Sequence, residues 1–138
     1  MNEVFKYCPN SKLMLVKWTG KFSMDEYMIG LDSFIIETKR NEIKNIIHDI
    51  RDLDFNLKPS KVAEIANVRI KYIENKHNSI YITHKPQDVV FAILFADMVK
   101  DQKTNHCSTI EMAVKLLKLE DNFEAIFKAF RKLESITA

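Results

Sequence analysis

Residues 43–60, IKNIIHDIRDLDFNLKPS, decide the fold of this 138-residue chain. The first half of the stretch, Ile43 to Ile50, is typical of a β-strand, and the adjacent Ile46 and Ile47 predict that both faces of the strand are covered. A polar loop follows, and Pro59 then suits the first turn of a helix, where its missing N–H leaves no hydrogen bond unmade. A covered strand that leads into a helix indicates a crossover unit of an α/β protein.

The residues before this unit predict a hairpin and a capped helix. Two apolar strands, Val4 to Cys8 and Leu13 to Trp18, flank the turn-forming residues 9–11, Pro-Asn-Ser. Ser23 and Glu26 then match the two ends of a capping box, in which the Ser23 side chain accepts from the third helical amide and Glu26 reaches back. We therefore expect an antiparallel strand pair followed by a helix.

Strands and helices continue to alternate after the first crossover. The predicted elements are a helix from Pro59, a strand over Ser79–Thr83, a helix over Gln87–Val99, a short strand over Asn105–Cys107 and a helix behind the capping box Ser108–Glu111. The last element, residues 121–138, is a C-terminal amphipathic helix. The order ββαβαβαβαα predicts a single α/β domain over residues 1–138. Its sheet should be mixed, mostly parallel and four- to five-stranded, with helical crossovers and the first strand antiparallel at or near an edge.

The composition is that of an ordinary globular protein, with 46% apolar and 29% charged residues. A net charge of +2 is nearly neutral, so we expect no nucleic-acid partner. The longest uncharged apolar stretch, Val89 to Ala96, is too short to span a membrane. The first residues lack the pattern of an export signal, so Cys8 and Cys107 are expected to be reduced thiols in a cytoplasmic protein.

Three stretches give the chain a resemblance to a known family. WTGKFSMDEY, residues 18–27, has a strand that ends in glycine and a capped helix that opens on an acidic–tyrosine pair. IIHDIRDL, residues 46–53, is similar to the third strand of that family with its acidic exit, and EMAVKLL, residues 111–117, is similar to its closing helix. In these residues the chain resembles the SpoIIAA-like branch of the STAS-type fold.

The resemblance implies a non-enzymatic regulatory or protein-interaction module of SpoIIAA-like type. In the anti-sigma-factor antagonists of this fold, a serine at the start of the helix after the third strand is phosphorylated, and the surface around it binds a kinase partner. The nearest position here is Ser60, and the family's Asp-Ser-Ser/Thr-Gly signature is replaced by residues 55–60, FNLKPS. The resemblance also allows a small-molecule or lipid-binding role, which other SpoIIAA-like proteins are thought to have.

The topology predicts where a site would lie. In an open α/β sheet, ligands bind beyond the carboxyl ends of the parallel strands, where several helices also begin. We call this edge the strand-exit rim, and its helix starts should turn amide N–H groups toward an anion. The predicted rim consists of Trp18, Thr19, Asp49, Arg51, Asp52, Ser60, His84, Lys85 and Cys107.

The rim carries residue types of a catalytic site without the spacing of one. Asp49 and Asp52 could act as general acid and base or hold a metal, or they could pair with Arg51 between them. Three histidines could share a metal only by converging from three strands, because none has a ligand at the usual helical spacing. These histidines are His48, His84 and His106.

Cys107 precedes a helix start, where the dipole lowers the pKa of a thiol, and a small buried cysteine is the alternative. Its neighbour His106 should point to the opposite face of the strand, so it is a poor base for this thiol. The sequence has no nucleophile elbow, phosphate-binding glycine loop or zinc-helix motif. We therefore predict no catalytic residue, no metal and no cofactor. An enzyme would need Asp49, Asp52, His84 or Cys107 to meet at one point.

Apolar features favour binding instead. Val89 to Ala96 is apolar around the whole helix, which predicts a helix packed between the sheet and the last helix; a lipophilic cavity or a dimer surface are alternatives. Trp18 and Phe22 suit the wall of an apolar pocket. The expected partner is a protein or a second copy of the chain. The alternative functions are binding of a small apolar or amphiphilic ligand, and an enzyme that uses the strand-exit rim.

Overall fold

The computed structural model describes residues 1–55, 58–73, 77–99 and 103–137 of the chain. Its elements follow the order ββαβαβαβαα, which confirms the order predicted from the sequence. The described strands are β1 (Asn2–Cys8), β2 (Leu13–Lys21), β3 (Asn45–Asp54), β4 (Asn78–Ile82) and β5 (Lys103–Cys107). The described helices are α1 (Met24–Arg40), α2 (Pro59–Tyr72), α3 (Pro86–Met98), α4 (Ile110–Leu116) and α5 (Phe123–Thr137), with short turns η1 (Pro9–Ser11) and η2 (Glu120–Asn122).

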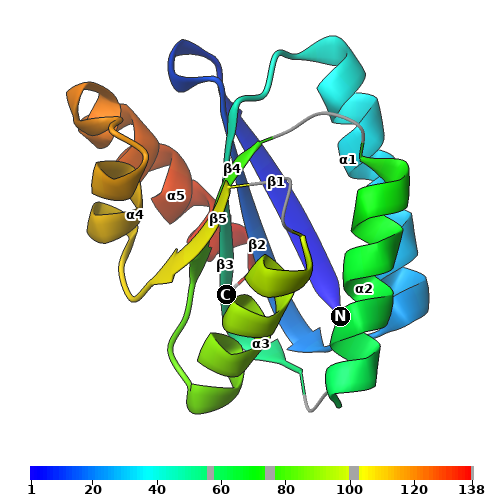
Figure 1. Cartoon of the computed structure of the whole chain (residues 1–138). Helices are drawn as coiled ribbons and strands as arrows, with labels where there is room; N and C mark the ends of the chain where they lie inside the picture. The colour runs from blue at the N-terminus through cyan, green and yellow to red at the C-terminus, as the bar shows by residue number, and fades with distance from the viewer. Residues whose placement is uncertain (56–57, 74–76, 100–102, 138) are drawn as a thin grey trace.

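The strands form a mixed sheet in their sequence order. β1 pairs antiparallel with β2 at one edge, and β2, β3, β4 and β5 follow as parallel neighbours. This arrangement confirms the predicted mostly parallel sheet with an antiparallel first strand. The sheet is covered on both sides (Figure 1), by α1, α2 and α3 on one face and by α4 and α5 on the other.

β2 explains why the central strands have such continuous apolar sequences. Met14 and Val16 pack under α1, α2 and α3, whereas Leu13 and Leu15 pack under α4 and α5. Because successive side chains of a strand point to opposite faces, a strand covered on both sides needs apolar residues at nearly every position. The same alternation turns Lys17 toward the face that α5 covers.

A β-bulge shifts the register between β2 and β3 at their carboxyl ends. Lys17 lies opposite Asp49, but Thr19 lies opposite Asp52, so β3 has one more residue than β2 in this interval. A bulge changes the direction of the side chains that follow it. Here it allows both aspartates to reach the same lysine.

The predicted position of α3, between the sheet and the last helix, is wrong. α3 packs on the face that also carries α1 and α2, and α5 lies on the opposite face (Figure 1). The reason is the strand order: right-handed crossovers that always step in the same direction across a sheet place their helices on the same face. No described helix is both long enough and apolar enough to cross a membrane.

The two predicted capping boxes form only in part. Ser23 Oγ accepts from the amide of Glu26 at 3.4 Å as predicted, but the Glu26 carboxylate pairs with the amino group of Met1 at 2.6 Å and does not reach back. The cap of α4 is Thr109 and not Ser108, because Thr109 Oγ1 accepts from the amide of Met112 at 3.1 Å. One position therefore separates the predicted cap from the observed one.

Candidate functional site

A buried ion-pair network joins the carboxyl ends of β2 and β3. The fully buried carboxylate of Asp49 accepts hydrogen bonds from Arg51 Nε and Nη2, both at 2.9 Å, and from Lys17 Nζ at 3.0 Å. Lys17 Nζ also donates to Asp52 at 3.0 Å. The Arg51 guanidinium lies over the ring of Phe130, 5.8 Å from its centroid, so the network also contacts α5.

The partners in this network fix its charges. Burial alone would raise the pKa of Asp49, but the hydrogen bonds and charges of Arg51 and Lys17 outweigh it and hold that pKa below its usual value. Burial would likewise lower the pKa of Lys17, and its two aspartate partners raise it instead. Both oxygens of Asp49 already accept hydrogen bonds, so this carboxylate has little capacity left to act as a general base.

A second set of contacts fastens the start of α3 to the end of β3. Lys85 Nζ donates to the carbonyl oxygens of Arg51 at 3.0 Å and Leu53 at 3.1 Å. The buried carboxylate of Asp88 accepts from the backbone amides of His84 and Lys85, both at 2.9 Å. Lys85 and Asp88 thus hold the rim in shape, whereas the His84 side chain is exposed to solvent.

Cys107 is a buried thiol at the carboxyl end of β5. Its Sγ donates to the carbonyl oxygen of Thr109 at 3.3 Å. Burial raises the pKa of the Cys107 thiol, although the Thr109 hydrogen bond and the Arg51 charge act in the opposite direction. The structure therefore offers no activated nucleophile at this position, in contrast to the alternative drawn from the helix start.

The three histidines that were considered as metal ligands lie in different environments. His48 is buried on the face that α1, α2 and α3 cover, where its ring stacks on Tyr81 with 4.4 Å between centroids. His84 is exposed, and His106 is half-buried on β5. Within the described part of the chain, no three histidine, cysteine, aspartate or glutamate side chains form a group that could hold a metal ion.

The other predicted rim residues lie in different environments. Trp18 is buried against Tyr27, with 5.4 Å between ring centroids, and the space that it lines has a volume of only about 10 Å³. It is therefore not the wall of an open apolar pocket. Thr19 is half-buried near the end of β2, and Ser60 is exposed as the second residue of α2. Residues 56–57 of the loop before Ser60 lie outside the described residues.

The rim does contain an apolar groove, which lies between the first turns of α2 and α3. Its volume is about 280 Å³. The stacked rings of Phe55 and Phe91, 4.2 Å apart, lie at its base, and Val90 on α3 stands beside it with 55% of its surface exposed. The residues of this α2–α3 groove are Phe55, Pro59, Val62, Pro86, Gln87, Val90, Phe91 and Leu94.

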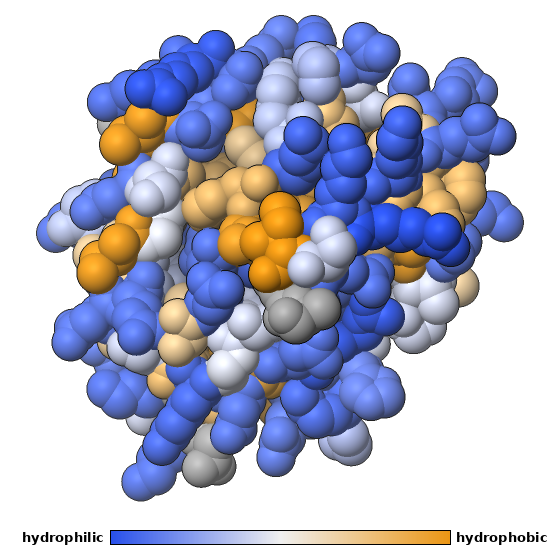
Figure 2. Space-filling model, turned by 180° about the vertical axis from the view of Figure 1, so that it is seen from behind, coloured by the Kyte–Doolittle hydropathy of each residue, from blue (hydrophilic) through white to orange (hydrophobic). Residues whose placement is uncertain are grey.

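Among the described residues, the surface on the back of the molecule carries no large apolar patch (Figure 2). Seen from that side (Figure 2), the molecule is mostly hydrophilic, and its apolar side chains form small separate patches. Such scattered apolar residues are ordinary on a protein surface. The α2–α3 groove is therefore the strongest candidate for a binding surface at the strand-exit rim.

The fold matches a known structure. The structure of the anti-sigma factor antagonist SpoIIAA in its unphosphorylated form superimposes with a TM-score of 0.58 and 14% sequence identity. The match covers 83% of this chain and 96% of that one. This chain has the SpoIIAA fold. No family model matches the sequence, and no curated protein matches it. The predicted resemblance is therefore confirmed for the fold alone.

Lys17 was not singled out from the sequence, and a cavity or a dimer surface at Val89 to Ala96 was expected only as an alternative, although the sequence contains a signal for both features. A single lysine in the apolar strand LMLVKW must find an anionic partner if the strand is covered on both faces. The apolar residues all around α3 predict that one of its sides stays exposed unless another element covers it. Here Val90 and Ile93 form that exposed side.

Proposed function

We propose that this chain is a non-enzymatic regulatory module that binds a partner protein in the α2–α3 groove. The observation that carries the proposal is the exposed apolar surface of α3 beside the groove, where Val90 and Ile93 have 55% and 53% of their surface exposed. Apolar side chains gathered next to an apolar groove are typical of an interaction surface. The shared fold adds support by analogy, because the SpoIIAA structure is that of an anti-sigma factor antagonist.

The charges around the groove suggest the chemistry of the partner. α2 and α3 both begin here, so the positive ends of two helix dipoles face this end of the domain. Lys58 precedes α2 and adds positive charge, whereas the charge of Lys85 before α3 is paired with Asp88 at 3.8 Å. We therefore expect the partner to present apolar side chains next to an acidic group.

The two alternative functions, an enzyme and a small-ligand binder, have weaker support. The carboxylates of the rim are engaged in ion pairs, which disfavours an enzyme that uses Asp49 or Asp52. A small apolar or amphiphilic ligand is the second candidate, because the groove is only slightly smaller than a typical ligand pocket of about 300 Å³ or more. Cys8 and Cys107 are both free thiols, which supports a cytoplasmic location.

A photo-crosslinking experiment tests the proposal. A benzophenone amino acid replaces Val90 in one version of the full chain and Met112 in another. Met112 is a matched control because it is 50% exposed and lies on α4, on the opposite face of the sheet. Irradiation in cells should give a heterologous protein adduct at position 90 only. The adduct partner, identified by mass spectrometry and purified, should then bind the unmodified chain in solution.

The possible results separate the candidates. An adduct with a second copy of the chain at position 90 would mean that the groove is a homodimer interface. An adduct with a small molecule would favour the ligand-binding alternative. Equal protein adducts at positions 90 and 112, or a purified partner that does not bind, would contradict the proposal.

A further inference from the structure

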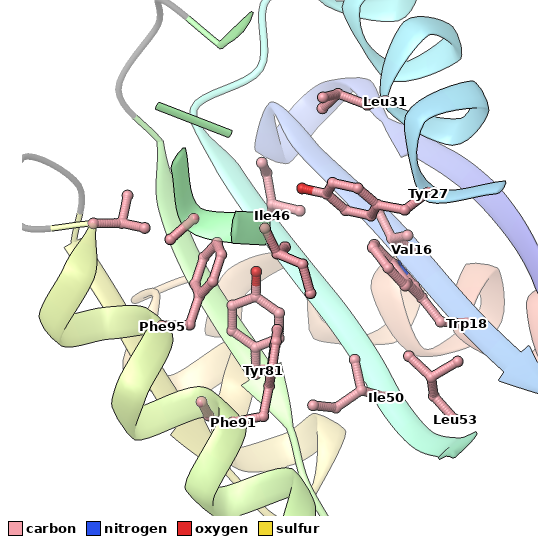
Figure 3. Close-up of a cluster of buried hydrophobic side chains, with 14 of the residues drawn as sticks. Val16, Trp18, Tyr27, Leu31, Ile46, Ile50, Leu53, Tyr81, Phe91 and Phe95 are labelled. Carbon is pink, nitrogen blue, oxygen red and sulfur yellow. The ribbon is translucent and has the colours of Figure 1, made fainter. Parts of the chain in front are cut away.

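A small, mostly apolar cavity lies in the core, under α1, α2 and α3. Its volume is about 10 Å³, and a few polar side chains interrupt its apolar lining. Figure 3 shows three residues of this layer, Trp18 from β2, Tyr27 from α1 and Tyr81 from β4, with their rings turned toward the same part of the core. The polar side chains that line the cavity are Trp18, Tyr27, His48, Arg69 and Tyr81.

Trp18 and His48 have buried polar atoms without a hydrogen-bond partner among the described residues. Trp18 Nε1 and both ring nitrogens of His48 make no hydrogen bond with any described residue. His48 is 97% buried, and its ring lies edge-on to Trp18, with 6.1 Å between centroids. A buried donor or acceptor that has lost water and gained no partner costs free energy, so native proteins rarely leave one unsatisfied.

The charge state of His48 decides what its nitrogens can do. Burial, followed by the positive charges of Arg69 and His77, holds the pKa of His48 well below its usual value. The imidazole is therefore neutral near neutral pH, so one nitrogen donates and the other accepts. Trp18 Nε1 can only donate. A group that accepts from the indole and donates to the imidazole would satisfy an atom of each.

We propose that this cavity is a hydration site that holds one structural water between Trp18 Nε1 and His48. A cavity of about 10–15 Å³ is the smallest that holds a water molecule, and a buried water needs two to four polar partners. The cavity has that size and those partners, and it is too small for a chloride ion or an apolar ligand. The water accepts a hydrogen bond from the indole N–H and donates one to the imidazole.

The site lies directly beneath the α2–α3 groove. Phe55 and Phe91 line both the groove and the cavity, so their stacked rings form the wall between the two. This aromatic wall separates the water from the groove. We therefore expect the water to exchange slowly compared with the tumbling of the protein. The inference does not depend on whether the groove binds a partner.

Nuclear magnetic resonance tests the proposal directly, because Trp18 is the only tryptophan in the chain and its indole N–H signal needs no further assignment. In the full chain labelled with ¹⁵N, the indole proton should show NOE and ROE cross-peaks to water with opposite signs, the mark of a long-lived bound water. Tyr27→Phe and Tyr81→Phe are the controls, because they remove two hydroxyls that could relay exchange. The cross-peaks should remain in both variants.

A second variant removes the partner of the water. His48→Phe replaces the imidazole by an apolar ring and should abolish both cross-peaks. If that variant does not fold, the wild-type spectrum still decides. Absence of the cross-peaks in the wild type, their loss in either folded tyrosine variant, or a direct ¹⁵N–¹⁵N coupling between Trp18 and His48 would overturn the proposal.

Discussion

At the scale of single residues, Lys17 and Asp49 show how a charge is kept inside this fold. Each is almost fully buried, and each has its partner on the neighbouring strand. Taking a charge out of water is costly, and the opposite charge compensates only while both partners are present. The pair is therefore more informative when one member is removed than when both are replaced.

We expect Asp49→Asn to lower the free energy of unfolding by about 3 kcal/mol, because it leaves Arg51 without its carboxylate partner and Lys17 with only the exposed Asp52 as counter-charge. The double change Lys17→Met with Asp49→Leu should cost less than the sum of the two single changes. Urea unfolding of the wild type, Lys17→Met, Asp49→Leu and the double variant gives the coupling free energy, and the same measurement on Asp49→Asn tests the first expectation. A single change that costs less than about 0.5 kcal/mol, the level of an exposed pair, would show that the pair contributes little.

Glu3 provides a pH-dependent prediction. Burial raises its pKa to about 7 from the ordinary 4.5, although the Arg69 charge opposes the rise. Between these two pH values the folded chain binds a proton that the unfolded chain has lost, so Glu3 makes the protein less stable as the pH rises. Glu3→Gln should remove this pH dependence. The free energy of unfolding of Glu3→Gln minus that of the wild type should therefore increase between pH 5 and pH 8. The slope is at most about 1.4 kcal/mol per pH unit. Urea unfolding at both pH values checks this, and a constant difference would contradict it.

At the scale of elements, α1 and β1 pack closely because α1 has a glycine, Gly30, where the two meet. A Cβ atom on Gly30 of α1 would collide with the Glu3 carboxylate of β1. In an open helix, Gly→Ala stabilises by about 1 kcal/mol. Here the contact should reverse that sign, because the crowded carboxylate must move.

We expect Gly30→Ala to lower the stability by at most about 1 kcal/mol, less than the usual cost of overpacking, because the colliding atoms are the far end of the flexible Glu3 side chain. In a chain that also carries Glu3→Ala, the same substitution should become neutral or stabilising, because the colliding group is gone. Thermal unfolding of the wild type, both single variants and the double variant measures this. A Gly30→Ala protein that is more stable than the wild type would mean that Glu3 moves aside at little cost.

Ser60, the second residue of α2, allows a test of the charge of the partner. An aspartate at this exposed second position of the helix should stabilise the helix slightly, by about 0.3–1 kcal/mol, through the helix dipole. Its negative charge should repel an acidic group of the partner, so binding should weaken relative to Ser60→Ala. Calorimetric titration with the partner found by crosslinking compares the two variants. Equal affinities would show that the acidic group does not bind at this end of the groove.

Much of the element order could be predicted from the sequence, because turns, caps and apolar patterns are local signals. The face on which α3 lies could not, since it depends on the order of the strands in the sheet. The pairing of Lys17 with Asp49 also needed the register of β2 against β3, and the bulge adds Asp52 to that pair. Trp18 was predicted at an open rim, but Tyr27 covers it in the core. A residue's place along a strand does not reveal which helix covers it.

At the scale of the whole molecule, the two faces of the sheet differ in how they are closed. On one face, the amphipathic α5 turns an apolar stripe inward, with Ile126 and Leu133 buried. On the other face, α3 is apolar on its inner and outer sides, so Phe91 and Phe95 are buried while Val90 and Ile93 remain in solvent. An exposed apolar side that contributes little to folding fits a surface used for binding.

This contrast gives a prediction that separates binding from folding. Val90→Glu should change the free energy of unfolding by less than about 0.5 kcal/mol, because the side chain is more than half exposed and leaves no cavity. It should nevertheless weaken binding of the partner by tenfold or more, since it places a charge at the centre of an apolar contact. Met112→Glu on α4 changes a similarly exposed side chain on the other face and should affect neither property.

Urea unfolding and calorimetric titration of the wild type and the two variants test the expected stability and the expected binding. If Val90→Glu unfolds the chain, α3 needs its outer side for folding; if Met112→Glu weakens binding as much, the partner does not bind at the groove.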